Sequence, residues 1–157
     1  MRPPARRAHA PSGFTLLEIV IVVAILGLLA ALAIPAYGRV VEKARIAQAI
    51  GDIKAIGQNA LAYELENGRL PSGLDELGMG SVVDPWGNDY VYVVLSDKGK
   101  GAAGARKDRF LVPINSYFDL YSKGPDESSA LALTAKSSQD DIIWANDGGF
   151  VGSGAQY

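Results

Sequence analysis

The chain has 157 residues, a formal net charge of −2, no cysteine and one histidine, His9. This length allows one small domain plus an anchor but not two full domains. The absence of cysteine excludes a disulfide framework and catalysis by a thiol.

Charge is distributed unevenly along the chain. Arg2, Arg6 and Arg7 precede a long apolar run, whereas residues 110–157 contain two basic and six acidic residues. Basic residues before an apolar segment favour insertion with the N-terminus on the cytoplasmic side of a membrane. We therefore expect a basic N-terminal segment on the cytoplasmic side and an exported body.

The first predicted element is a helix of membrane length. The 21 residues from Phe14 to Ile34 carry a single charge, Glu18, and would form about 31 Å of helix, one hydrocarbon thickness. A carboxylate at that depth is costly and needs a partner. A secretory signal cleaved near Ala33 is the alternative, although its apolar region would be shorter. We predict a permanent anchor over residues 14–35.

The helical pattern continues beyond this anchor. Apolar residues recur at steps of three and four, at Val40, Val41, Ala44, Ala47, Ile50, Ile53, Ile56, Ala60 and Leu61. This spacing predicts an amphipathic half over residues 36–67, ending at Asn67-Gly68. Pro35 removes one hydrogen bond inside the helix and predicts a kink, and Gly27 is a second weak point.

Residues 68–157 show strand and turn signals instead. Ser72 and Asp75 predict a short, capped helical turn. DPWGNDYVYVVL (84–95) predicts a turn with Trp86 packed on the helix and then a strand, and RFLVPI (109–114) and YFDLYS (117–122) predict two more strands. The basic, glycine-rich residues 98–107 predict a flexible loop. The predicted fold is α+β: one long N-terminal helix packed on a small antiparallel sheet with a loop-rich C-terminus.

Four segments of the chain resemble a known family. GFTLLE (13–18), with basic residues before it and a long apolar helix after it, resembles the class III signal of type IV pilins and pseudopilins. DPWGNDY (84–90), FDLYSKGPD (118–126) and DDI (140–142) are similar to the major, G-type pseudopilin of type II secretion. The resemblance implies a pilin-like fold and a structural subunit of a filament.

The resemblance also implies a role for Glu18. In this family a prepilin peptidase cleaves after the glycine, here Gly13, and so removes a leader, here residues 1–13. The same enzyme methylates the new amine of Phe14. Phe14 and Glu18 are four residues apart and share one helical face, so Glu18 would pair with the amine of a neighbouring subunit. The family further implies that the helix between Gly27 and Pro35 unwinds in the filament; a merely kinked anchor is the alternative.

A calcium site in the C-terminal region is a further implication, because carboxylates and carbonyls suit Ca²⁺. Carried over by motif, the ligands would be Asp126, Asp140, Asp141, the carbonyl of Lys123 and the hydroxyl of Ser138 or Ser137. Thirteen residues separate Asp126 from Asp140, more than the family pattern leads us to expect. A solvated acidic loop is the alternative. Asp119 is assigned to a strand or its exposed edge rather than to the metal.

These observations predict a subunit of a type II secretion pseudopilus, which helps folded proteins to cross the outer membrane. Expected partners are further copies of the chain, the inner membrane, the prepilin peptidase, the assembly platform and minor pilin-like subunits. The body would lie in the periplasm, with the filament there or at the cell surface. A surface type IV pilus and an exported binding module are the alternatives.

Two other classes of function are not expected. Removal of the leader would also remove His9, leaving no histidine or cysteine for general base or thiol catalysis, so we expect no enzyme. The glycine-rich loop lacks the phosphate-binding motif G-x-x-x-x-G-K-[ST], and we expect no nucleic-acid partner.

Overall fold

The structure is a computed structural model that describes residues 13–95 and 104–157. Within them lie one α-helix, four strands and four short 3₁₀ turns: α1 (Leu16–Asn67), β1 (Val91–Val94), β2 (Phe118–Ser122), β3 (Ile142–Ala145), β4 (Phe150–Ser153), η1 (Leu74–Leu77), η2 (Lys136–Ser138), η3 (Asn146–Gly148) and η4 (Gly154–Gln156). The chain divides into two compact units, the first ending at Val41 and the second running from Glu42 to Tyr157.

Helix α1 has nearly the bounds that the apolar spacing predicts. It ends at Asn67, after which the Gly68 amide donates to the Glu64 carbonyl at 2.8 Å and Gly68 adopts a φ of +70°. Glycine is favoured there because it enters the left-handed region without a steric penalty. Pro35 lies inside α1, and the kink that it predicts stays a prediction.

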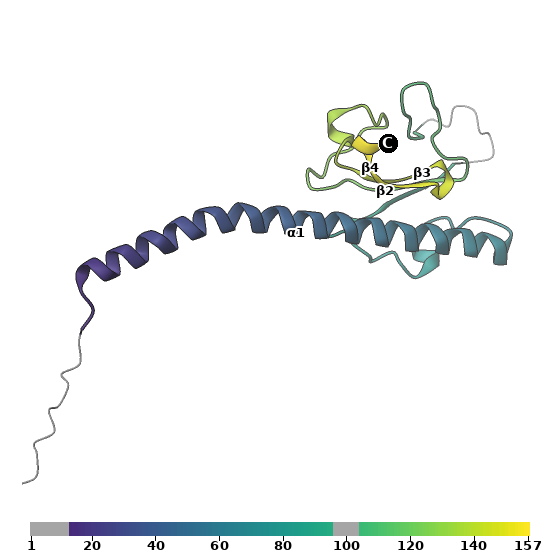
Figure 1. The fold of residues 1–157 in the computed structure, drawn as a ribbon. Helices are drawn as coiled ribbons and strands as arrows, with labels where there is room; N and C mark the ends of the chain where they lie inside the picture. Colours follow the sequence, from purple (N-terminus) through teal and green to yellow (C-terminus); the bar gives the residue numbers. More distant parts are fainter. Residues whose placement is uncertain (1–12, 96–103) are drawn as a thin grey trace, which may run out of the picture. The chain divides into compact units, whose positions relative to one another are not determined.

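The four strands form one antiparallel sheet in the order β1-β2-β3-β4. Strands β2, β3 and β4 lie alongside the second half of α1 (Figure 1). The sheet is therefore a meander, in which each strand pairs with the next one along the chain. The fold class predicted from the sequence, a long helix on a small antiparallel sheet, is confirmed.

The main core lies between one face of this sheet and the second half of α1. Its buried members are Ala49, Ile53, Ile56, Ala60, Tyr90, Phe118, Leu120, Ile142 and Trp144. The helical members recur at steps of four and three, as an amphipathic helix requires. The predicted stripe is right for Ile53, Ile56 and Ala60, but Ala44 and Ala47 are exposed because the buried face runs through Ala49 instead.

The other face of the sheet is covered by loops. Strand β3 contributes Ile143 and Ala145 to a second cluster with Ile114 and Leu133, and the rings of Phe150 and Tyr157 pack against it 5.3 Å apart. Both faces of β3 are therefore buried, and the C-terminal loops form part of the core.

Two local predictions are wrong. RFLVPI is not a strand: Asp108 and Leu111 close a tight turn on each other by two backbone hydrogen bonds, and Pro113, which has no N–H, follows. Ser72 does not pair with Asp75; its hydroxyl donates to Glu76 Oε1 at 2.8 Å. The predicted short helical turn itself is present as η1.

Trp86 packs on the helix as predicted. Its ring joins the main core, and its indole Nε1 donates to Glu42 Oε1 at 3.2 Å. The predicted flexible loop of residues 98–107 falls mostly on residues 96–103, which lie outside the described residues.

Gly57 provides a direct test of the main core. A Cβ at this position would overlap the six-membered ring of Trp144, whereas a Cβ on Gly51 of the same helix would meet nothing within 4 Å. We predict that Gly57→Ala lowers the free energy of unfolding by about 1–3 kcal/mol, because the core would be overpacked. Gly51→Ala should raise it by about 0.5–1 kcal/mol through helix propensity. Urea unfolding followed by tryptophan fluorescence measures both, and a Gly57→Ala chain as stable as the parent would contradict this packing.

Candidate functional site

The predicted processing site lies just before α1. Gly13, Phe14 and Thr15 precede the first helical residue and are exposed, Phe14 with 83% of its surface. The bond between Gly13 and Phe14 is therefore accessible and lies outside regular secondary structure, as a peptidase substrate requires.

Glu18 already has a partner within the chain. Its Oε2 accepts hydrogen bonds from the backbone N–H and the hydroxyl of Thr15, both at 2.8 Å, and the Glu18 N–H donates to Thr15 Oγ1 at 3.2 Å. This arrangement is a capping box, in which a Thr at the N-cap and a Glu three residues later satisfy each other's backbone donors. The spacing Thr-x-x-Glu is the sequence signal for this cap.

The first part of α1 is a candidate membrane span. Its best window has a mean hydropathy of 2.9 and none of that window is buried inside the structure. Leucine, isoleucine and valine side chains are exposed on every side of it. Gly27 and Pro35 both lie within this helix, and their proposed role in assembly stays a prediction.

The structure brings together two of the predicted calcium ligands. The Asp126 N–H donates to Asp140 Oδ2 at 3.3 Å, and both residues line one open pocket. Gly124, with a φ of +67°, lies against Asp140 so closely that a Cβ would come within 2.5 Å of the Asp140 carbonyl oxygen. Lys123 precedes this glycine and is half-buried.

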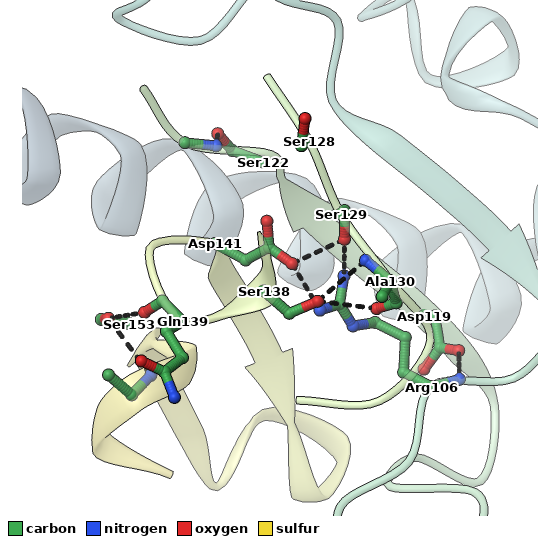
Figure 2. A network of polar contacts seen from close by, with 12 residues as sticks. Arg106, Asp119, Ser122, Ser128, Ser129, Ala130, Ser138, Gln139, Asp141 and Ser153 are labelled. Carbon is green, nitrogen blue, oxygen red and sulfur yellow. Dashed lines mark hydrogen bonds and ion pairs between the residues drawn. The ribbon is translucent and has the colours of Figure 1, made fainter. Parts of the chain in front are cut away.

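Asp141 points elsewhere, into a buried cluster. Its Oδ2 accepts from Arg106 Nη2 at 2.5 Å and from Ser129 Oγ at 2.6 Å, and Arg106 Nη1 donates to Ser129 Oγ at 2.9 Å (Figure 2). Arg106 and Asp141 are 2% and 0% exposed. Burial raises the pKa of the Asp141 carboxyl, and the hydrogen bonds from Ser129 and Arg106 act against this rise.

Ser138 is also occupied by other contacts. Its hydroxyl accepts from the Ala130 N–H at 2.8 Å and donates to the Ala130 carbonyl at 2.9 Å. A hydroxyl can donate only one hydrogen bond, and here the Ala130 carbonyl oxygen accepts it. Ser138 therefore holds the loop after Asp126 in place.

The predicted ligand set does not fit a calcium ion in this arrangement. Ca²⁺ takes six to eight oxygens, but Asp141 Oδ2 and the Ser138 hydroxyl already have other partners. Asp141 Oδ1 is buried without a hydrogen-bond partner among the described residues, so it is one free acceptor. Across residues 13–95 and 104–157, no three acidic, histidine or cysteine side chains gather in a way that could hold a metal.

Asp119 lies in a strand, which is the first of the two places that the sequence predicts for it. It lies in β2 as expected, but it is 1% exposed and not at an edge, because β2 is an inner strand between β1 and β3. Its carboxylate accepts from the Arg106 N–H at 2.7 Å and from Asn115 Nδ2 at 2.9 Å. Asp119 thus anchors the connection between β1 and β2 at two points, and local alternation could not reveal these partners.

The DPWGNDY motif forms a turn held by Asp84. Oδ1 of this buried carboxylate accepts from the N–H groups of Trp86 and Asn88 at 3.0 and 2.8 Å, and Oδ2 accepts from the Ser122 hydroxyl at 2.5 Å. The motif therefore fastens the turn before β1 to the end of β2, and its role is structural.

Removal of the Asp84 carboxylate tests this assignment. Asp84→Ala leaves two backbone N–H groups and one hydroxyl without their acceptor, so the free energy of unfolding should fall by about 2 kcal/mol or more. Asp89→Ala, at an exposed position of the same motif, should change it by less than about 0.5 kcal/mol. Chemical unfolding of both variants measures these changes. Equal losses of unfolding free energy at the two positions would contradict the role of Asp84.

The chain matches known proteins over most of its length. Residues 9–34 match the family described as "Prokaryotic N-terminal methylation motif". The chain is 37% identical over 136 residues to the type II secretion system core protein G of Pseudomonas aeruginosa, covering 73% of this chain and 84% of that protein. The protein of the same name from Escherichia coli is 36% identical over 143 residues, covering 77% and 86%.

Other comparisons are narrower. Fimbrial protein Q of Moraxella bovis is 41% identical over 63 residues, which is 40% of each chain. No solved structure gives a significant match. Because more than two thirds of each protein named core protein G is covered at over 30% identity, the chain belongs to the family of the type II secretion system core protein G.

Proposed function

We propose that this chain is a structural subunit of a type II secretion pseudopilus. In this proposal a prepilin peptidase cleaves it after Gly13, its apolar helix anchors it in the inner membrane, and it then polymerises through that helix. The globular unit faces the periplasm. The protein catalyses no reaction. It functions by being added to a filament and withdrawn from it.

The observation that carries the proposal is the exposed apolar half of α1. Residues 16–34 present large aliphatic side chains around the whole helix, and the described part of the chain provides no cover for the candidate span. A helix that is apolar all round belongs in a bilayer or in the core of an assembly. Before assembly, lipid would cover this surface, and in the filament neighbouring copies of the same helix would replace it.

Glu18 gives this assembly its register. Cleavage after Gly13 would turn the Phe14 amide into an amine, which is cationic near neutral pH. The capping box with Thr15 holds the Glu18 carboxylate at the start of the helix. Pairing with the amine of a neighbouring copy would neutralise both charges, whereas a misplaced subunit would leave one charge buried and uncompensated, which is costly.

A surface pilus is the weaker alternative. The fimbrial proteins of Moraxella bovis and Neisseria meningitidis match over 40% and 46% of this chain, whereas the proteins named core protein G match it over more of its length. The proposed partners are therefore those of a secretion system: further copies, minor pilin-like subunits, the assembly platform and the peptidase. Calcium is not part of the proposal, because two of its predicted ligands, Asp141 and Ser138, hydrogen-bond to other groups.

Processing is the first test. We predict that the protein recovered from membranes of cells with the secretion system starts at an N-methylated Phe14, as measured by intact mass and N-terminal sequencing. In cells that lack the prepilin peptidase, the same chain should keep residues 1–13. A mature chain that starts near Ile34 would instead indicate an ordinary secretory signal and would overturn the filament proposal.

Glu18→Gln tests the pairing separately from folding. Glutamine keeps an oxygen that accepts from Thr15, so the capping box and the helix should persist, but the charge that pairs with the amine is lost. We predict normal cleavage and membrane insertion with filament yield reduced at least tenfold, measured by shearing and immunoblotting. Glu66→Gln, at an exposed position near the end of α1, is the matched control and should assemble normally. Normal filament yield from Glu18→Gln would contradict the pairing.

A further inference from the structure

Arg106 is a fully buried cation in the C-terminal loops. Its side chain contacts Asp141 and Ser129, and its guanidinium lies 4.0 Å from the centre of the Tyr121 ring. Its backbone N–H donates to Asp119. A single residue therefore connects its own loop to strand β2, to the loop after Asp126 and to the residue that precedes β3 (Figure 2).

The long connection between Asp126 and Asp140 builds one wall of this cluster. Ala132 pairs with Lys107 in a parallel bridge, in which Lys107 N–H donates to the Leu131 carbonyl and Leu133 N–H to the Lys107 carbonyl, both at 2.9 Å. This bridge holds Lys107, the residue after Arg106, beside the backbone that follows Ser129. The connection therefore encloses one side of the guanidinium.

Asp141 requires a positive charge at this place. A fully buried carboxylate is strongly destabilising unless a cation or several donors compensate it. Calcium would be one such cation, but it needs six to eight oxygens. A guanidinium needs only acceptors for its five N–H donors, and it is always charged. The contacts on Asp141 Oδ2 come from Arg106 and Ser129, so the charge of this carboxylate is already compensated by a buried cation and a hydroxyl donor.

We propose that, in this chain, the Arg106 guanidinium takes the place of the calcium ion that the family resemblance implies for the C-terminal region. It neutralises Asp141 and ties the C-terminal loops together, so that these loops keep their fold without a divalent cation. This inference does not depend on the proposed filament, because it concerns only the stability of the globular unit.

The parent protein gives the first test. The full chain, purified in a mild detergent, is unfolded by heat in EDTA and in calcium chloride while the near-UV circular dichroism of its tryptophans is recorded. Trp144 is a suitable reporter because it lies in β3 and stacks on Phe118 with ring centres 5.7 Å apart. The expected Tm is the same in both solutions. A Tm that falls by several degrees in EDTA and returns with calcium would overturn the proposal.

Arg106→Gln gives the second test, with Lys107→Gln as the matched control. Both variants lose one positive charge from adjacent positions, but the Lys107 side chain is exposed. We expect Arg106→Gln to lower the Tm by roughly 10 °C, because it leaves the Asp141 carboxylate buried without its cation. Lys107→Gln should leave the Tm unchanged. Equal Tm values for the two variants would contradict the role of Arg106.

A double variant covers the case in which Arg106→Gln does not fold. Arg106→Gln with Asp141→Asn removes both charges, so no uncompensated carboxylate is buried. The double variant should therefore have a higher Tm than Arg106→Gln, or should fold where that variant does not. A double variant less stable than Arg106→Gln would show that the two residues do not form a pair and would overturn the proposal.

Discussion

The structure depends on one helix that carries two kinds of surface. Along the first part of α1 the exposed side chains are aliphatic on every side, and along the second part only a stripe through Ala49, Ile53, Ile56 and Ala60 is buried. Apolar surface is stable only when something other than water covers it. The chain supplies that cover for the stripe, by means of its sheet and Trp144, and leaves the first part to a bilayer or to further copies. Anchoring and assembly both follow from this division.

The C-terminal loops are ordered by a different means, the pairing of buried polar groups. Asp84, Asp119 and Asp141 are all nearly inaccessible to solvent, and each accepts hydrogen bonds from residues far away in the sequence. A buried carboxylate without partners would cost several kcal/mol, so each one fixes the loop that carries its donors. Arg106 is the only one of these partners that brings a full charge. For this reason a chain with few strands and many loops can still form a second packed face on its sheet.

Much of the fold was predictable because its signals are local. The steps of three and four residues in α1, the Asn-Gly at its end and the β-branched and aromatic residues of β1 and β2 depend only on neighbouring residues. The pseudopilin family indicated by the motifs is confirmed by relatives that match over most of their length. Strand β3 gives no local signal because it is buried on both faces and shows no alternation, and β4 gives a weak one because Gly152 interrupts it. The local sequence around Arg106 predicts a flexible basic loop, because its partner, Asp141, lies 35 residues away. Such pairs depend on the folded topology, which no local pattern contains.

A structure of the assembled filament, determined by electron cryo-microscopy and helical reconstruction, would test this account most directly. The account predicts that residues 14–35 of neighbouring copies pack together in the filament core, with the Glu18 carboxylate of one copy beside the Phe14 amine of the next. A filament in which these residues lie outside the core, or in which Glu18 faces solvent, would contradict it.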